Sequence, residues 1–298
     1  MDPSSRHTQP SAPAADALMT SLPAHLLDDI LTRLDLCDIV RSSALSRAWR
    51  FRWESLPALS LSFLDRPDTP RSAVDSILVR YAGRISRFSF KIDPKSVSLD
   101  YWLIAFSRRG VESIDLRSSK MRFKLHSSIF SCGHLVTLEL HKCFFPPLPP
   151  GFAGFPSLEE LKLTDVEFDK TEGLEAIISR SPLLQALMIY NVTIDMYDCE
   201  EYLIQAPNLR SVTIFADSYY WWGFRELPRL AGATIDMDNY VEEYDFGEFL
   251  SAFAHVEKLI SLFYLPATNR YFIYLISLFC MERFECVNVA SMFKSMEI

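Results

Sequence analysis

The chain has 298 residues, of which 49% are hydrophobic, and its 30 Lys and Arg residues against 38 Asp and Glu residues give a net charge of −8. This length and hydrophobic content suffice for a buried core and indicate about two domains. The acidic balance argues against non-specific binding to nucleic acid or anionic membranes, because both depend on a cationic protein surface.

Residues 1–20 are rich in Pro, Ser and Ala and lack the apolar core of a secretory signal, which predicts a disordered tail. The most apolar stretch, 259–281, is interrupted at Pro266, and the remaining run 271–281 is too short for a bilayer span of about 20 residues. The six cysteines are scattered without a C-x-x-C pair. We therefore expect a cytosolic or nuclear chain with no membrane partner, no metal and no cofactor.

Three short helices are predicted over residues 21–61. Pro23 suits the first turn of a helix, where its missing N–H is not needed. Apolar residues then recur at three- and four-residue spacing and predict one amphipathic helix: Leu27, Ile30, Leu31 and Leu34. Asp38 can begin a second helix, and residues four positions apart mark a third: Leu45, Trp49 and Trp53. So small a unit needs a partner or the following domain for stability.

Leu22 and Leu26 lie off the expected inward stripe, beside Pro23, and leave an apolar edge. Such an edge is typical of a docking face, although it could equally be a helical cap that packs on the rest of the chain.

This segment resembles a plant-type F-box. The matching residues stand in the family's order and spacing: Leu22-Pro23, Ile30-Leu31, Leu34, Asp38-Ile39-Val40-Arg41, Leu45-Ser46-Arg47, Trp49-Arg50 and Trp53. The resemblance implies binding to the Skp-type adaptor of an SCF (Skp, cullin, F-box) ubiquitin ligase and, through the adaptor, to cullin and RING subunits. The contact residues that it implies are Leu22, Pro23, Leu26, Leu27, Ile30 and Leu45. Cys37 and Ala48 stand where relatives usually carry a basic residue, so we expect weaker binding at the rim of this contact.

An arginine cluster in the same segment could indicate a nucleic-acid patch: Arg41, Arg47, Arg50 and Arg52. The acidic chain and the F-box resemblance favour a solvated helix face instead. No nucleic-acid partner is expected.

From Ile85 onward the chain repeats an apolar triple of the form L-x-x-L-x-L. The triples are Ile85-Phe88-Phe90, Val111-Ile114-Leu116, Leu135-Leu138-Leu140, Leu158-Leu161-Leu163, Leu184-Leu187-Ile189, Leu209-Val212-Ile214 and Leu230-Ala233-Ile235, followed by Val256 and Leu259. Their starts are 21 to 26 residues apart, within the range of leucine-rich repeats. Each triple is expected to form a short parallel strand, with partly helical return segments such as 169–181 and 196–207.

The repeats are irregular. Eight residues after each start, where such repeats often carry Asn or Cys, only Cys143 fits. The combination resembles plant F-box/leucine-rich-repeat proteins over about residues 21–257. In that family the repeats capture a substrate protein and other subunits transfer ubiquitin, so the resemblance implies a receptor that is not an enzyme.

The expected fold is α/β: a three-helix F-box followed by an irregular leucine-rich-repeat solenoid, a horseshoe of parallel strands. The expected divisions are a tail at 1–20, the F-box at 21–61, a connecting segment at 62–84, repeats at 85–262 and a C-terminal segment at 263–298. The last segment is either a cap on the final repeat or a divergent tail.

No nucleophile elbow, P-loop, dinucleotide-binding or zinc-helix motif is found. His134, His141 and Cys143 are close in sequence, but the repeat register turns Cys143 to the core and His141 to the concave face. A buried structural thiol is the favoured interpretation.

Residues two, four and six places after each start should point away from the core. In the early repeats they are mostly charged: Arg87, Lys91, Asp115, Arg117, Glu139, His141, Glu160 and Lys162. In the later repeats they are partly apolar: Met188, Tyr190, Ser211, Thr213 and Phe215. Aromatic residues dominate binding hot spots, so the expected substrate-binding residues are Met188, Tyr190, Phe215, Trp221 and Trp222. Several of these aromatics could instead pack as core.

The run 236–248 holds six carboxylates and predicts a solvated loop, or one that steers a basic substrate.

Taken together, the sequence features favour a substrate receptor of an SCF-type ligase. Two alternatives are an interaction scaffold that directs no degradation and a leucine-rich-repeat sensor of a small molecule or pathogen product. Adaptor binding separates the sensor from the other two.

Overall fold

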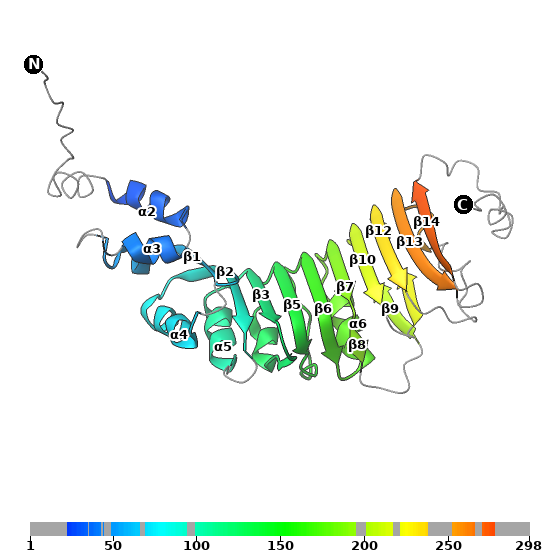
Figure 1. Cartoon of the computed structure of the whole chain (residues 1–298), viewed down its shortest axis with the longest axis horizontal. Coiled ribbons are helices and arrows are strands. Elements are labelled where there is room, and N and C mark those ends of the chain that lie inside the picture. The colour runs from blue at the N-terminus through cyan, green and yellow to red at the C-terminus, as the bar shows by residue number, and fades with distance from the viewer. Residues whose placement is uncertain are drawn as a thin grey trace, which may run out of the picture. The chain divides into compact units, whose positions relative to one another are not determined.

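A computed structural model of the chain describes residues 23–34, 36–42, 44, 49–65, 69–93, 99–194, 201–216, 221–237, 252–265 and 270–277. The chain divides into two compact units, residues 1–155 and 156–298. Figure 1 shows helices in the N-terminal part and strands with covering helices in the rest.

The first unit begins with α2 (Ala24–Thr32), α3 (Leu36–Ser42) and the short 3-10 helix η1 (Arg52–Ser55). Their apolar residues form a small core: Leu27, Leu31, Leu36, Ile39, Trp49 and Trp53. The expected third helix is present as the 3-10 helix η1, where the backbone closes tight turns with bonds from Arg52 N–H to Trp49 O and from Leu56 N–H to Trp53 O. Residues 45–48 lie outside the described residues.

The sheet of the first unit is parallel, with strands in the order β1 (Ala58–Ser62), β2 (Arg84–Ile92), β3 (Ser113–Ser118) and β5 (Thr137–Phe144), and with β4 (Phe123–Lys124) paired to β5. Helices α4 (Arg71–Arg80) and α5 (Asp100–Arg108) and the 3-10 helix η2 (Ser127–Ser131) return the chain. The segment 62–84, expected only to connect, thus contains α4. Rings from β2 and α5 fill the core, with Phe88 and Phe106 centroids 4.4 Å apart.

The second unit continues the pattern with parallel strands β6 (Glu160–Phe168), β7 (Ala186–Tyr190), β10 (Ser211–Ala216), β12 (Gly232–Met237) and β13 (Lys258–Leu265). Strand β8 (Thr193–Ile194) pairs with β6, and helix α6 (Thr171–Ser179) confirms a helical return at 169–181. Strand β14 (Arg270–Ser277) runs antiparallel to β13. The final strand therefore pairs along the edge of the last repeat strand.

The second return segment differs from expectation. Residues 201–205 are not helical but form β9 (Glu201–Gln205), which pairs in parallel with β11 (Trp221–Arg225) in a separate sheet. Within β9, Ile204 is buried, and the Leu203 N–H donates to the Glu175 side chain of α6 at 2.8 Å. Backbone pairing with a later segment decides this conformation, and the helical spacing in the sequence does not.

The predicted repeat core is confirmed. Every residue of the seven triples is buried, as are Val256 and Leu259. The strand register stacks them, with Leu187 opposite both Leu161 and Val212. The opposite face of each sheet, called the open face below, carries the alternate residues, which are half-buried or exposed except for the buried Ser89 of β2.

A left-handed backbone position follows the triples in three repeats. Lys142, Asp165 and Asn191 stand seven residues after their triple's start and have φ of 57°, 53° and 49°. The next residues, Cys143, Val166 and Val192, turn back into the core. Such φ values are unfavourable for most side chains, but Asn and Asp tolerate them best. The Asn191 side-chain amide also donates to Asp165 Oδ1 at 2.7 Å.

Candidate functional site

Helix α2 carries the residues expected to contact an adaptor, and it divides them between two faces. Leu27 and Leu31 are buried, whereas Leu26, Ile30 and Leu34 are 43%, 41% and 38% exposed. Leu26 and Ile30 lie four residues apart on one side of the helix, and Leu34 follows at the same spacing two residues after the helix ends. Pro23 precedes the helix and is also exposed. This exposed row is called the α2 edge below.

Two details differ from the sequence-based expectation. Ile30 and Leu34 were expected on the inward stripe but face outward, because the buried stripe consists of Leu27 and Leu31 alone in this segment. Leu27, implied as a contact residue, belongs to the chain's own core and is 6% exposed. Leu22 and Leu45 lie outside the described residues. Leu34 was not predicted to join the exposed row, although its spacing from Leu26 and Ile30 gave the signal.

An ion pair joins η1 to α2. Arg52 of η1 donates from Nε and Nη2 to the two carboxylate oxygens of Asp28, at 2.8 and 2.9 Å. The hydrogen bond to Asp28 raises the pKa of Arg52. Arg41 pairs with Asp38 at the surface. Part of the arginine cluster is thus committed to carboxylates within the segment, as expected of a solvated face.

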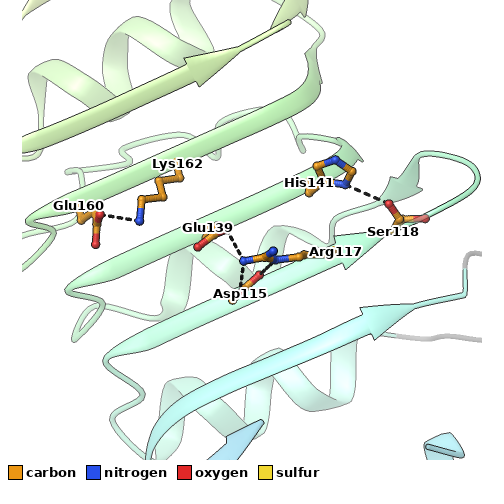
Figure 2. Close-up of polar contacts among 7 residues, drawn as sticks. All are labelled: Asp115, Arg117, Ser118, Glu139, His141, Glu160 and Lys162. Atoms are coloured by element: carbon orange, nitrogen blue, oxygen red, sulfur yellow. Dashed lines mark hydrogen bonds and ion pairs between the residues drawn. The ribbon is translucent and has the colours of Figure 1, made fainter. Parts of the chain in front are cut away.

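The open face of the first unit is charged. Figure 2 shows Arg117 of β3 bonded to Asp115 on its own strand and to Glu139 on β5. The Arg117 Nε–Asp115 Oδ1 distance is 2.8 Å, and the Arg117 Nη2–Glu139 Oε1 distance is 2.6 Å. Hydrogen bonding to Asp115 raises the pKa of Arg117. His141 Nδ1 donates to the Ser118 carbonyl at 3.0 Å. The predicted outward positions are therefore confirmed here.

The open face of the second unit is charged on β6 and partly apolar on the next strands, β7 and β10. On β6, Lys162 and Glu160 form an ion pair at 2.7 Å (Figure 2). On β7, Met188 and Tyr190 are 39% and 50% exposed, and Phe215 of β10 is half-buried. The register sets Phe215 opposite Tyr190, with ring centroids 5.6 Å apart. The structure thus brings these three expected substrate residues together on neighbouring strands.

The two tryptophans of the expected substrate site do not join this group. Trp222 is 1% exposed, so its expected role at the edge of the open face is wrong. Its strand β11 pairs with β9 in the second sheet, and its burial there removes the indole from solvent. Trp221 stands on the same strand, but its side chain is outside the described part of the structure.

The thiol and imidazole groups near β5 do not form a catalytic pair. Cys143 is buried, and this burial raises the pKa of its thiol, which disfavours the reactive thiolate. His141 lies on the open face, and His134 is exposed. In the described ranges, no three His, Cys, Asp or Glu side chains are placed to hold a metal ion. Nor is any described helix long and apolar enough to cross a membrane.

Comparison with known proteins covers both parts of the chain. Residues 19–61 match the F-box domain, and residues 99–270 match the repeats described as "FBD-associated F-box protein At5g56370, LRR repeats". The chain is similar to F-box/FBD/LRR-repeat protein At1g13570 of Arabidopsis thaliana, with 30% identity over 83% of this chain and 62% of the relative. It is also similar to F-box/LRR-repeat protein 13 of the same plant, with 31% identity over 67% of this chain and 46% of the relative.

The matched part of the chain thus spans about half to three fifths of the length of these relatives. The F-box match covers the helices that form the α2 edge, and the repeat match covers most strands of both open faces. The chain belongs to the plant F-box/leucine-rich-repeat family.

Proposed function

We propose that the chain is the substrate-recognition subunit of an SCF-type ubiquitin ligase. The α2 edge binds the Skp-type adaptor, which connects the chain to the cullin and RING subunits, and the open face of the second unit holds the substrate protein. Ubiquitin transfer belongs to the other subunits, so the chain needs no catalytic residue and no cofactor. The proposal places the chain in the cytosol or nucleus, in keeping with the free thiols of Cys132 and Cys143.

The α2 edge is the observation that carries this proposal. An isolated helix bundle gains nothing by exposing Leu26, Ile30 and Leu34 while its other face is buried. Docking of an adaptor groove onto the row would remove these side chains from water, each stabilising the complex by roughly 1–3 kcal/mol if it becomes fully buried.

The test is co-purification of the full chain with a Skp-type adaptor. Leu26→Ala with Ile30→Ala should lower adaptor affinity by at least hundredfold, because central buried anchors contribute about 2 kcal/mol or more each. Leu183→Ala is the matched control, since Leu183 is 46% exposed and lies on the second unit. Undiminished adaptor binding by the double variant would refute the assigned role of the edge.

Substrate binding rests on Met188, Tyr190 and Phe215, an apolar group on an otherwise polar open face. Tyr190→Ala with Phe215→Ala should abolish capture of the substrate by the chain in cells treated with a proteasome inhibitor. Adaptor binding should persist. Tyr101→Ala is the control, because Tyr101 is exposed on α5. Normal capture, or a stability loss above about 3 kcal/mol as expected for core aromatics, would exclude this group as the binding centre.

The same capture experiment separates the proposed function from its alternatives. A receptor lowers the abundance of its partner in an adaptor-dependent way, and the partner recovers when the proteasome is inhibited. A scaffold binds the adaptor and the partner but leaves the partner's abundance unchanged. A ligand sensor binds no adaptor.

A further inference from the structure

Basic side chains gather where the strands of the first unit end. The register sets Arg117 of β3 opposite Lys91 of β2 on one side and His141 of β5 on the other. Neighbouring strands lie about 4.8 Å apart, so the three groups form one row across the open face. Lys124 of β4 is exposed and pairs with Phe144 of β5. Lys91, Arg117, Arg122, Lys124 and His141 are called the basic rim below.

The local charge is opposite to that of the whole chain. Residues 1–155 contain 20 Lys and Arg against 15 Asp and Glu, a net charge of +5, whereas residues 156–298 contain 10 against 23, a net charge of −13. Over residues 115–158 the sequence has five Lys and Arg against two acidic residues, Asp115 and Glu139. A cationic surface on an acidic protein attracts anionic partners selectively at that place.

The guanidinium of Arg117 is fixed in place by two carboxylates and keeps donors for such a partner. Its Nε and Nη2 hydrogens are committed to Asp115 and Glu139. Among the described residues, none bonds to its Nη1, which keeps two N–H donors for an incoming carboxylate. Because two carboxylates already fix the guanidinium, an incoming carboxylate finds its donors in place and less side-chain entropy is lost on binding.

Apolar side chains accompany the basic ones. Met121 is 64% exposed and Phe144 is 37% exposed, and the Arg122 guanidinium lies 6.0 Å from the centre of the Phe144 ring. Arg, Met and aromatic residues together are typical of protein-binding surfaces. A continuous polyanion such as nucleic acid fits less well, because Asp115 and Glu139 occupy the next row of the same face and leave only a short basic row. A peptide can place its carboxylates at the basic side chains and apolar side chains between them.

We propose that the basic rim binds a carboxylate-rich segment of the protein that the chain captures. This proposal deepens the substrate-receptor function and rests on it. Carboxylates of the segment pair with Lys91, Arg117 and Lys124, and apolar side chains between them contact Phe144.

The test uses fluorescence anisotropy with the full chain and three fluorescein-labelled probes. The first is a peptide in which Glu alternates with Phe, the second is its Gln-for-Glu counterpart, and the third is an oligothymidylate of equal charge. The Glu peptide should bind most tightly. Its binding should weaken as salt rises, because the screening length falls from about 10 Å at 0.1 M to about 3 Å at 1 M.

Charge-reversal variants locate the site. Lys91→Glu and Lys124→Glu should each weaken binding of the Glu peptide by about tenfold, because each replaces an attractive charge with a repulsive one. Arg108→Glu is the matched control: Arg108 is exposed on α5, and its reversal changes the net charge equally but should change binding less than twofold. Melting curves of all three variants should match the wild type.

Equal binding of the Glu and Gln peptides, or equal weakening by Arg108→Glu, would overturn the proposal. Tighter binding of the oligothymidylate, sensitive to Lys91→Glu and Lys124→Glu, would identify a nucleic-acid surface and also overturn it. Adaptor co-purification with the same preparations is a separate readout. If the adaptor does not co-purify while the Glu peptide still binds, the receptor function is refuted. If the adaptor co-purifies while the Glu peptide does not bind, only the proposed role of the basic rim is refuted.

Discussion

Leu161→Asp tests the repeat core directly. Leu161 lies on β6 opposite Leu187 of β7, and both are buried. Removing a buried Leu side chain to Ala destabilises by about 3–5 kcal/mol, and a polar group buried without a partner adds about 1–3 kcal/mol. The expected loss of about 4–8 kcal/mol is a large part of a typical total stability of about 5–15 kcal/mol. The variant should therefore unfold the second unit.

Thr164→Asp on the same strand is the matched control. Thr164 is half-buried on the open face, opposite Tyr190, so the same carboxylate should remain hydrated there. We expect it to change the free energy of unfolding by less than about 1 kcal/mol. Thermal unfolding followed by far-ultraviolet circular dichroism, with size-exclusion chromatography of each variant, measures the difference.

Two results would refute this reasoning. A monomeric Leu161→Asp protein with an unchanged melting curve would show that Leu161 is not a core residue. Equal destabilisation by both variants would show that the alternation of buried and open positions along β6 is misassigned.

Two further predictions concern local structure. Burial raises the pKa of Tyr81 to about 12 from 10.0. The contribution of Tyr81 to wild-type stability should therefore be complete below pH 10 and fall between pH 10 and 12. Tyr81→Phe should lower the free energy of unfolding by about 1–2 kcal/mol at neutral pH and show a flatter dependence on pH between 10 and 12. The Tyr81 hydroxyl lies within hydrogen-bond distance of the Leu56 and Arg84 carbonyls, so an unchanged melting temperature at neutral pH would count against this bond. Asn191→Ala should lower the free energy of unfolding by about 1–2 kcal/mol and Asn191→Gly by less, because Gly suits the φ of 49°; equal losses would exclude backbone strain as the cause.

The repeat core could be predicted from the sequence because its rule is local. A strand that buries one face must alternate its side chains, so the triple containing Leu158, Leu161 and Leu163 fixes both the strand and its inward face. The same alternation placed Arg117 and Tyr190 on the open face. The inward position of Cys143 was also predicted, and Cys143 is buried.

The errors arose where burial depends on residues far away in the sequence. Trp222 stands in an aromatic run that is compatible with either a surface or a core position. It is buried because β11 pairs with β9, a contact that the local sequence does not indicate. Ile30 fits the inward stripe by spacing, but the core against α2 is so small that Leu27 and Leu31 fill it. Local spacing therefore cannot tell how wide the buried face of a helix is.

The separation of faces keeps the residues of the scaffold apart from those that meet solvent. On β3, Ile114 and Leu116 are buried while Asp115 and Arg117 between and beside them meet solvent. Because successive side chains point to opposite faces, substitutions on the open face leave the core contacts intact and should change stability little. The same scaffold then presents charged side chains in its first unit and an aromatic pair in its second. Helix α2 separates its exposed row from its core residues in the same way at a different period, since the neighbouring residues Leu26 and Leu27 lie on opposite sides of the boundary between surface and core.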